Sequence, residues 1–349
     1  MEKKKKAALS GIFRSRTDWF FSMNGITTFF VSLALILIVC YINKFVKNAI
    51  PTYIQHIIVN CLLNAVLALG LNFIAGYLGQ TSLGHAVFFG IGAYTTACLL
   101  TYTGVNFWIS ILIGMVFAAI AAIPLALSSL RVKGQFLIVI TYAFCEIFRY
   151  IGINTPALGG NGGLAGLKAP LVFGTKITKI AATNKGGYMI LLFFMVAVVC
   201  YFTWRLERSR VGYAFHAIRE DEIAAQAMGI NTKYYKVLAM MISAVICSMA
   251  GSVQAAFATM VSPELFASAK SIQILTFVVI GGKMSIKGVI LGAALLTVVP
   301  ELLHSVKDAL SLGFDPWTIL YGILLVVMMR VRPQGFWGKK DVEPEEEEA

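Results

Sequence analysis

Charge is scarce in this sequence, and its scarcity excludes an ordinary water-soluble domain. Of the 349 residues, 13% are charged and 58% are hydrophobic, and the mean hydropathy is +0.79. A soluble domain of typical composition carries about 25% charged residues. The apolar runs are long and continuous, whereas the strands of a porin-type barrel alternate in short segments. The composition therefore predicts an all-α fold, a polytopic transmembrane helical bundle.

Several chemical motifs are also missing. The stretch 159–166 is rich in glycine around Asn161, but it lacks the GK[ST] ending and the preceding strand of a phosphate-binding loop. No His/Glu spacing suggests a metal site, and no Ser/His/Asp set suggests hydrolysis. The cysteines show neither CxxC nor Cys/His spacing, which predicts packing residues at Cys40, Cys61, Cys98, Cys145, Cys200 and Cys247. We therefore expect no metal, no cofactor and no ATP hydrolysis by this chain itself.

The basic residues lie beside the apolar runs, where they act as orientation signals. The net charge of +12 is distributed in this way, which favours membrane lipid over nucleic acid as a partner. The cluster Lys3–Lys6, with Arg14 and Arg16, resembles the start of a signal peptide. No A-x-A-like cleavage site follows the next apolar run, so we expect a retained first span.

A membrane-spanning helix needs roughly 20 apolar residues. By this measure we expect about ten spans, within a range of about eight to eleven. The candidate segments are 25–43, 56–75, 83–101, 107–130, 135–153, 187–204, 238–259, 264–281, 286–304 and 316–330.

The charge distribution predicts that both termini are cytoplasmic. A basic segment 1–24 then precedes a transmembrane domain over 25–335, and an acidic tail at 336–349 is expected to be disordered. The loop 205–237 is assigned to the cytoplasm and the loop 154–186 to the outside. One conflict remains, because the outer loop carries Lys168, Lys176, Lys179 and Lys185.

The stretch 76–94 reads GYLGQTSLGHAVFFGIGAY. Glycine lets helices approach closely in lipid and lets the backbone bend, which favours helices that surround a route. Gln80, Thr81, Ser82 and His85 offer uncharged hydrogen-bonding groups that suit the passage of a small zwitterion. A structural role is the other interpretation, and for His85 it is the preferred one, since such groups in membrane helices mostly bond to other helix atoms.

Glu146 and Arg149 lie three residues apart in the predicted span 135–153. Charges within lipid are costly and face a partner or a water-filled cavity. The spacing predicts an ion pair on one helix face. The pair either lies near a translocation pathway or orients the helix, and the sequence leaves both open.

The loop 205–237 contains a run of good helix formers from about Ala214 to Met228, and Gly229 follows as a typical helix stop. A short helix beneath the membrane is a surface that a partner protein can bind, although a simple connection between spans is the alternative. Glu222, Ala224, Ala225 and Gly229 are similar to the Glu-Ala-Ala-x-x-x-Gly loop by which ABC importer permeases dock onto ATPase subunits. Here Ile223 separates the glutamate from the alanine pair.

Several separated motifs carry a wider resemblance. They are the stretch 76–94, EIFR at 146–149, LGGNGGLAG at 158–166, RVGYAFHAIREDEIAAQAMGI at 210–230 and VVIGGKMSIKGVILGAALLTVVPELL at 278–303. Over roughly residues 55–335 the chain resembles the LivM-type permease subunits of branched-chain amino acid ABC importers. It departs from their pattern at Met284 and Lys287, where relatives usually have a small residue or glycine and an aromatic residue.

The resemblance implies a transport subunit, not an enzyme, in the cytoplasmic (inner) membrane of a bacterium. The implied partners are a second, homologous permease, cytoplasmic ATP-binding subunits and an extracytoplasmic solute-binding protein. It places ATPase coupling at Arg219, Glu220, Asp221, Glu222, Ala224, Ala225 and Gly229, and a translocation pathway at Gln80, Thr81, Ser82, His85, Glu146 and Arg149.

Two other functions remain open at this point. Permeases of urea or short-chain amide importers look very similar, and the sequence does not separate them from amino acid permeases. An ion-coupled secondary transporter would need acidic groups within the membrane. Glu146 is the carboxylate that would serve, and Arg149 is placed to neutralise it.

Overall fold

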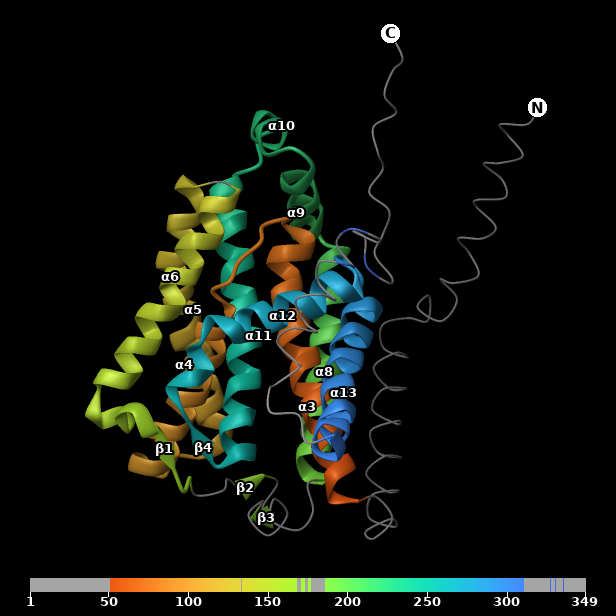
Figure 1. The fold of residues 1–349 in the computed structure, drawn as a ribbon. Coiled ribbons are helices and arrows are strands. Elements are labelled where there is room, and N and C mark those ends of the chain that lie inside the picture. Colours follow the sequence, from red (N-terminus) through yellow and green to blue (C-terminus); the bar gives the residue numbers. More distant parts are fainter. Residues whose placement is uncertain are drawn as a thin grey trace, which may run out of the picture.

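The computed structural model describes residues 51–132, 134–167, 171–172, 175–176 and 186–310, together with residues 327, 330 and 335. This part of the chain is a bundle of helices that run mostly side by side (Figure 1). The predicted spans 25–43 and 316–330, the basic segment 1–24 and the acidic tail 336–349 lie outside the described residues.

Ten α-helices form the described bundle. They are α3 Thr52–Asn72, α4 His85–Cys98, α5 Phe107–Arg131, α6 Gln135–Asn154, α8 Gly186–Glu207, α9 Arg210–Glu220, α10 Glu222–Ala227, α11 Thr232–Ala258, α12 Ser268–Gly281 and α13 Ile286–Leu310. Short π-helical segments, Phe73–Tyr77 and Leu99–Thr103, extend α3 and α4. Three 3-10 turns lie at Pro156–Leu158, Gly160–Gly162 and Pro263–Phe266.

Four two-residue strands complete the described secondary structure. β1 Leu164–Ala165 pairs antiparallel with β4 Met260–Val261, and β2 Leu171–Val172 pairs antiparallel with β3 Thr175–Lys176. All four lie at the end of the bundle opposite to α9 and α10 (Figure 1). We refer to the two ends as the α9–α10 end and the β1–β4 end.

Long apolar runs produce the membrane-spanning helices. Eight of the ten predicted segments, 56–75 through 286–304, appear as helices in the described part. Among the described residues, six helices are long and apolar enough to cross a membrane: Tyr53–Tyr77, His85–Thr103, Phe107–Leu130, Phe136–Asn154, Gly187–Glu207 and Thr232–Ala258. The all-α, polytopic character is therefore confirmed, while the full number of spans and the orientation of the termini stay predictions.

The predicted span 264–281 was wrong in length. Pro263 begins a 3-10 turn that ends at Phe266, so α12 starts at Ser268 and has 14 residues. A helix of this length is about 21 Å long, whereas the hydrocarbon core of a bilayer is about 30 Å thick. α12 therefore crosses only part of the bundle, and it lies in front of α11 and α3 in Figure 1.

α11 occupies the centre of the bundle and packs against α3, α4 and α5. Its contact with α4 is close because each helix has a glycine that faces the backbone of the other helix. A Cβ atom at Gly92 would collide with the carbonyl of Ser248, and one at Gly251 would collide with the carbonyl of Phe89. The hydroxyl of Ser252 donates to the carbonyl of Gly92 at 3.2 Å across the same contact. α4 and α11 therefore pack backbone against backbone, as small residues permit in membrane proteins.

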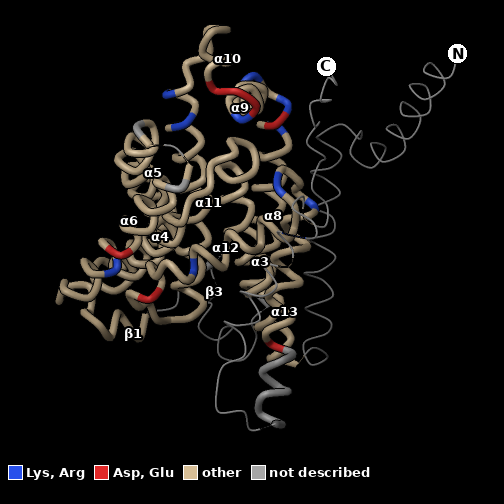
Figure 2. The backbone as a smooth tube through the Cα atoms, turned by 45° about the horizontal axis from the view of Figure 1, so that its top comes forward, with Lys and Arg blue, Asp and Glu red and all other residues tan. Residues whose placement is uncertain are grey.

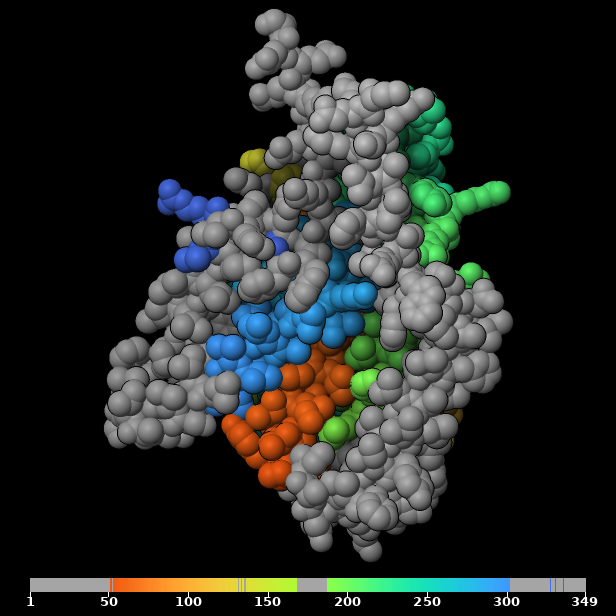
Figure 3. All heavy atoms as spheres, turned by 90° about the vertical axis from the view of Figure 1, so that its right-hand side faces the viewer, coloured from red at the N-terminus to blue at the C-terminus, as the bar shows by residue number. Residues whose placement is uncertain are grey.

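α3 also packs against α13, and the two helices lie side by side with α8 on the face shown in Figure 3. The turn between α12 and α13 is held by α3, since the Met284 amide donates to Asn72 Oδ1 at 3.1 Å. Met284 has a φ of 63°, a left-handed conformation that favours glycine. This backbone geometry explains why a small residue or glycine suits the position better than methionine.

Candidate functional site

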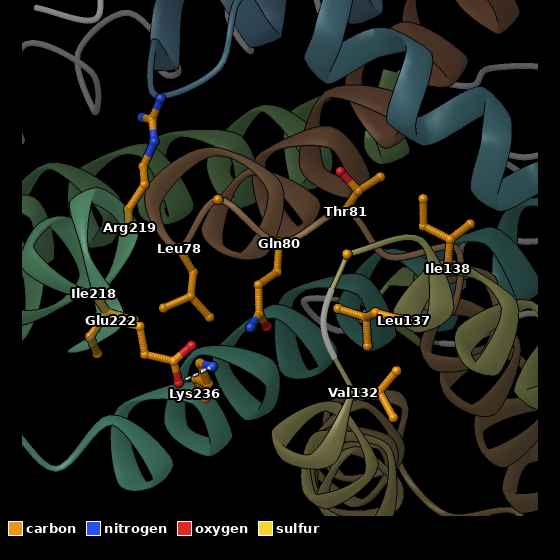
Figure 4. A pocket seen from close by; sticks show the side chains of 12 residues that line it. Leu78, Gln80, Thr81, Val132, Leu137, Ile138, Ile218, Arg219, Glu222 and Lys236 are labelled. Atoms are coloured by element: carbon orange, nitrogen blue, oxygen red, sulfur yellow. Dashed lines mark hydrogen bonds and ion pairs between the residues drawn. The ribbon is translucent and has the colours of Figure 1, made fainter. Parts of the chain in front are cut away.

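A cavity of about 440 Å³ lies at the α9–α10 end (Figure 4). We call it the α9–α10 cavity. Its wall is built from the loop that follows the π-helical end of α3, the start of α6, and parts of α9, α10 and α11. The polar side chains in this wall are Gln80, Thr81, Arg219, Glu222 and Lys236. Sequence segments that are far apart therefore meet in one concave site.

The segment after α9 shows why these residues meet. We expected one helix from about Ala214 to Met228, and this expectation was wrong. Asp221 breaks the run with extended backbone, φ −152° and ψ 114°, and its carboxylate accepts hydrogen bonds from the Ile223 and Ala224 amides at 2.7 and 3.1 Å. An aspartate cap of this kind starts a new helix, α10, in a different direction.

The end of α10 agrees with the predicted helix stop. α10 ends at Ala227, and Gly229 has a φ of 83°, which a residue with a side chain adopts only with strain. α11 then begins at Thr232, so the connection between α8 and α11 is shorter than the expected loop 205–237. Gln226 donates to the Thr232 hydroxyl at 2.8 Å and ties α10 to the start of α11.

An ion pair closes one side of the α9–α10 cavity. Lys236 Nζ lies 2.6 Å from Glu222 Oε1, and the side chains are 4% and 24% exposed. Lys236 was assigned to a cytoplasmic loop from the sequence, but it lies in the second turn of α11. The pair joins α10 directly to a central helix of the bundle.

The same cavity connects α9 to the loop that precedes α4. The stem of Arg219 lies next to Gly79, where a Cβ atom would be 3.0 Å from Arg219 Cγ. Gln80 extends from the loop towards the Glu222–Lys236 pair (Figure 4). Arg219 and Glu222, proposed for ATPase coupling, and Gln80 and Thr81, proposed for the pathway, are therefore neighbours around one space.

Most of the other coupling candidates lie on the outside of the helix pair. Glu220, Asp221, Ala224 and Gly229 are exposed, and Ala225 is buried against the rest of the structure. Two large apolar side chains beside them are strongly exposed: Ile223 is 73% and Met228 is 83% exposed. α10 thus projects from the end of the bundle (Figure 1) with both charged and apolar groups on its surface.

Ser82 and His85 are fully buried and do not line the described cavities. The imidazole Nε2 of His85 lies 2.8 Å from the Ser243 hydroxyl, which donates to the Gly70 carbonyl at 2.7 Å. This chain of contacts joins the start of α4 to α11 and α3. The placement agrees with the structural interpretation of His85, which the sequence analysis preferred.

The predicted pair of Glu146 and Arg149 is confirmed at 3.5 Å. The structure enlarges it, because Arg149 also lies 2.8 Å from Glu264, and the Ser268 hydroxyl donates to Glu146 at 3.2 Å. The network joins α6 to the 3-10 turn and α12, and it lies towards the β1–β4 end. In Figure 2 a small group of charged positions near α4, α6 and β1 lies apart from the larger group at α9 and α10.

A second cavity, of about 320 Å³, was not predicted. We call it the Lys270 cavity. It lies between α3, α4, α11, α12 and α13, with polar groups from Asn60, Asn64, Gln254, Glu264, Lys270, Gln273, Thr297 and Glu301. One signal was available in the sequence: Lys270 falls inside the predicted span 264–281, and a charge in such a segment marks a functional candidate.

Metal binding has no obvious location in the described part of the chain. No group of three or more His, Cys, Asp or Glu side chains there is arranged to hold an ion. The two cavities present amides, hydroxyls and single charges. Such linings suit the passage or transient binding of a small polar molecule.

Taken together, the long apolar helices, the projecting α9–α10 pair and the polar cavities inside the bundle define a multi-spanning helical membrane protein of the permease type. Comparison with known sequences specifies the family. Residues 53–329 match the family model described as the permease component of branched-chain amino acid transport systems, and the chain belongs to this family.

Individual relatives agree with the family match. The chain is 35% identical to LivM of Escherichia coli K12, a high-affinity branched-chain amino acid transport system permease protein, over 77% of this chain and 66% of the relative. It is 24% identical to LivH of Salmonella typhimurium, with the same description, over 80% of this chain and 92% of the relative. The chain thus covers 66% of the length of the E. coli LivM protein. No solved structure matches the chain.

Proposed function

We propose that this chain is a permease subunit of an ABC importer for branched-chain or related amino acids in the cytoplasmic membrane of a bacterium. ATP hydrolysis by partner subunits drives transport, and this chain carries the solute. The family membership and the names of the relatives LivM and LivH support the proposal.

The observation that carries the proposal is the α9–α10 cavity. It connects α9 and α10, which project beyond the bundle, with the loop at Gln80 and with the central helix α11. A partner that pushes or pulls on α10 therefore acts on the interior of the bundle through Glu222 and Lys236, 2.6 Å apart. This is the connection that an ATP-driven permease needs, because partner contacts must favour one packing of the helices over another.

The partner surface includes the apolar side chains Ile223 and Met228, which are 73% and 83% exposed on α10. Exposed apolar groups beside charged ones are typical of protein–protein contacts. In this proposal the α9–α10 end faces the cytoplasm and binds an ATP-binding subunit. The β1–β4 end faces outward and receives the amino acid from a solute-binding protein.

A second permease subunit completes the transporter in this proposal. Relatives named LivM and LivH both align with most of this chain, which shows that two related permease types exist in the family. A heterodimer of such chains would enclose the route between them. The switch between outward-open and inward-open forms would then involve both permeases.

The first test is a pull-down from detergent-solubilised membranes that contain the complete set of subunits. We expect an ATP-binding subunit to co-purify with the wild type and to be lost from the variant carrying Ile223→Asp and Met228→Asp. Tyr102→Asp is the matched control, since Tyr102 is 64% exposed at the opposite end of the bundle. Retention of the ATPase by the double variant would contradict docking at α10, and its absence from the wild type would contradict the importer assignment.

The alternatives receive less support from the structure. The ion-coupled transporter relied on Glu146, which accepts from Ser268 and pairs with Arg149. A carboxylate held in this way is poorly placed to take up and release an ion in each cycle. An importer for urea or a short-chain amide would use the same architecture, so uptake of labelled leucine and of labelled urea by reconstituted vesicles decides between these substrates.

A further inference from the structure

The Lys270 cavity lies halfway through the bundle, away from the α9–α10 cavity. Asn64 lies near the middle of the membrane-spanning segment Tyr53–Tyr77, and its Oδ1 is 3.3 Å from Lys270 Nζ. Glu264, at the β1–β4 side of the cavity, contacts Arg149 at 2.8 Å. The cavity therefore reaches from the middle of the bundle towards the outward end.

Lys270 places an ammonium group inside the bundle. Its ammonium group contacts Asn64 Oδ1 at 3.3 Å and Gln273 Oε1 at 3.1 Å, and it lies 5.9 Å from the centre of the Phe89 ring. Within the described residues no carboxylate lies at ion-pair distance from it. Charges within membranes are costly and usually serve a ligand, an ion or a partner. Amide oxygens and a ring stabilise an ammonium group only partly.

The position of Lys270 favours an anionic ligand for a second reason. It lies in the first turn of α12, where the helix dipole adds positive potential. Membrane transporters commonly direct the start of a broken helix at the carboxylate of a substrate. α12 is such a helix, since it begins inside the bundle after the turn Pro263–Phe266.

The rest of the wall provides two other kinds of contact. Asn60, Gln254 and Glu301 supply oxygen atoms that accept hydrogen bonds, and Leu63, Leu67 and Phe89 supply apolar surface. A branched-chain amino acid has one group for each kind: a carboxylate for a cation, an ammonium group for acceptors and an aliphatic side chain for apolar surface. At about 320 Å³ the cavity is at the small end of ligand sites, as a small solute requires.

We propose that the Lys270 cavity is a transient binding site for the amino acid in transit, in which Lys270 binds the α-carboxylate and the oxygen atoms opposite receive the α-ammonium group. This inference rests on the proposed importer function and specifies its substrate class as a zwitterion. The site is separated from the α9–α10 cavity by the contacts of His85, Ser243 and Gly70. The bound amino acid waits on the outward side of that layer until the helices repack.

The test uses the complete transporter, with both permeases and the ATP-binding subunits, in vesicles supplied with the binding protein. Leucine uptake and ATP hydrolysis are measured in parallel for the wild type, Lys270→Gln and Lys270→Arg. We expect Lys270→Gln to lower leucine uptake about tenfold while ATP hydrolysis changes little, because one charge-assisted contact is lost. Lys270→Arg keeps the cation and is expected to retain most of the uptake.

Two further variants make the result decisive. Arg205→Gln removes a basic residue that is exposed at the end of α8 and is expected to transport like the wild type. Asn60→Trp narrows the cavity without removing Lys270, so it tests the location even if Lys270→Gln fails to assemble. If Asn60→Trp or Lys270→Gln takes up leucine at the wild-type rate, the proposed binding site is wrong, while the proposed importer function still stands. Failure of the wild type to take up any amino acid would instead overturn the proposed function.

Discussion

The α9–α10 cavity and the Lys270 cavity each contain a lysine, and the two lysines differ in their partners. Lys236, at the α9–α10 cavity, pairs with Glu222 at 2.6 Å and is 4% exposed. Lys270, in the middle of the bundle, contacts only amide oxygens and an aromatic ring among the described residues, at 3.1 Å or more. Lys236 is thus neutralised by a carboxylate, whereas Lys270 has no carboxylate at ion-pair distance among the described residues.

This difference indicates two different roles for the two lysines. A paired charge joins two elements, here α10 and α11, so that a movement of one helix displaces the other. A cation held only by neutral groups does not join elements strongly, but it attracts an anion that enters the cavity. The comparison agrees with the two proposals, in which the α9–α10 cavity transmits force and the Lys270 cavity binds the solute.

The largest effect on folding stability is expected at the paired lysine. Lys236→Met leaves the Glu222 carboxylate three-quarters buried without its cation. We expect the free energy of unfolding to fall by about 3 kcal/mol. The thermal unfolding midpoint of the purified chain in detergent measures the loss, and ATPase capture should decrease with it.

The double variant Lys236→Met with Glu222→Met is the control for this prediction. Because it removes both charges, it should recover most of the lost stability. It should not recover coupling between ATP hydrolysis and uptake if the pair transmits force. Full coupling in the double variant would show that the pair serves stability alone.

A smaller loss of folding stability is expected from breaking the contacts of His85, Ser243 and Gly70, which lie between the two cavities. His85→Ala removes the contact with the Ser243 hydroxyl and leaves a void at the start of α4. We expect a loss of about 2 kcal/mol, from one buried hydrogen bond and the missing ring atoms. His85→Gln keeps a polar group at the position and should lose less. Equal unfolding midpoints for wild type and His85→Ala would show that the layer does not hold the helices together.

The smallest change in stability is expected at the unpaired lysine, although its effect on uptake is large. Within the described part of the chain, Lys270→Met does not break any ion pair, and Asn64 keeps its bond to the Thr297 hydroxyl at 2.9 Å. We expect the free energy of unfolding to change by less than about 1 kcal/mol. A loss as large as that of Lys236→Met would remove the distinction between the two cavities and would make Lys270 a structural residue.

The parts of the fold that depend on local pattern were predictable. The segments 107–130 and 135–153 coincide closely with α5 and α6, because each is a long apolar run with clear ends. The pair of Glu146 and Arg149 followed from helix geometry alone. In each case residues close in the sequence determine the result.

What could not be predicted depends on contacts between distant residues or on a single cap. The break at Asp221 was missed because the neighbouring residues are all good helix formers, and the side chain competes with the helix by bonding Ile223 and Ala224. The Lys270 cavity is lined by residues of helices between α3 and α13 that are far apart in the sequence. Such a cavity cannot be predicted from the spacing of neighbouring residues. Likewise, nothing near His85 indicates that Ser243 is its partner.

The glycine contact between α4 and α11 has a mechanical consequence. Helices whose backbones touch at Gly92 and Gly251 have no side-chain layer to deform, so they cannot slide past each other by a residue without collision. The pair is therefore a rigid strut through the permease. In the proposed importer, the movements that open a route for the solute therefore have to occur outside this helix pair.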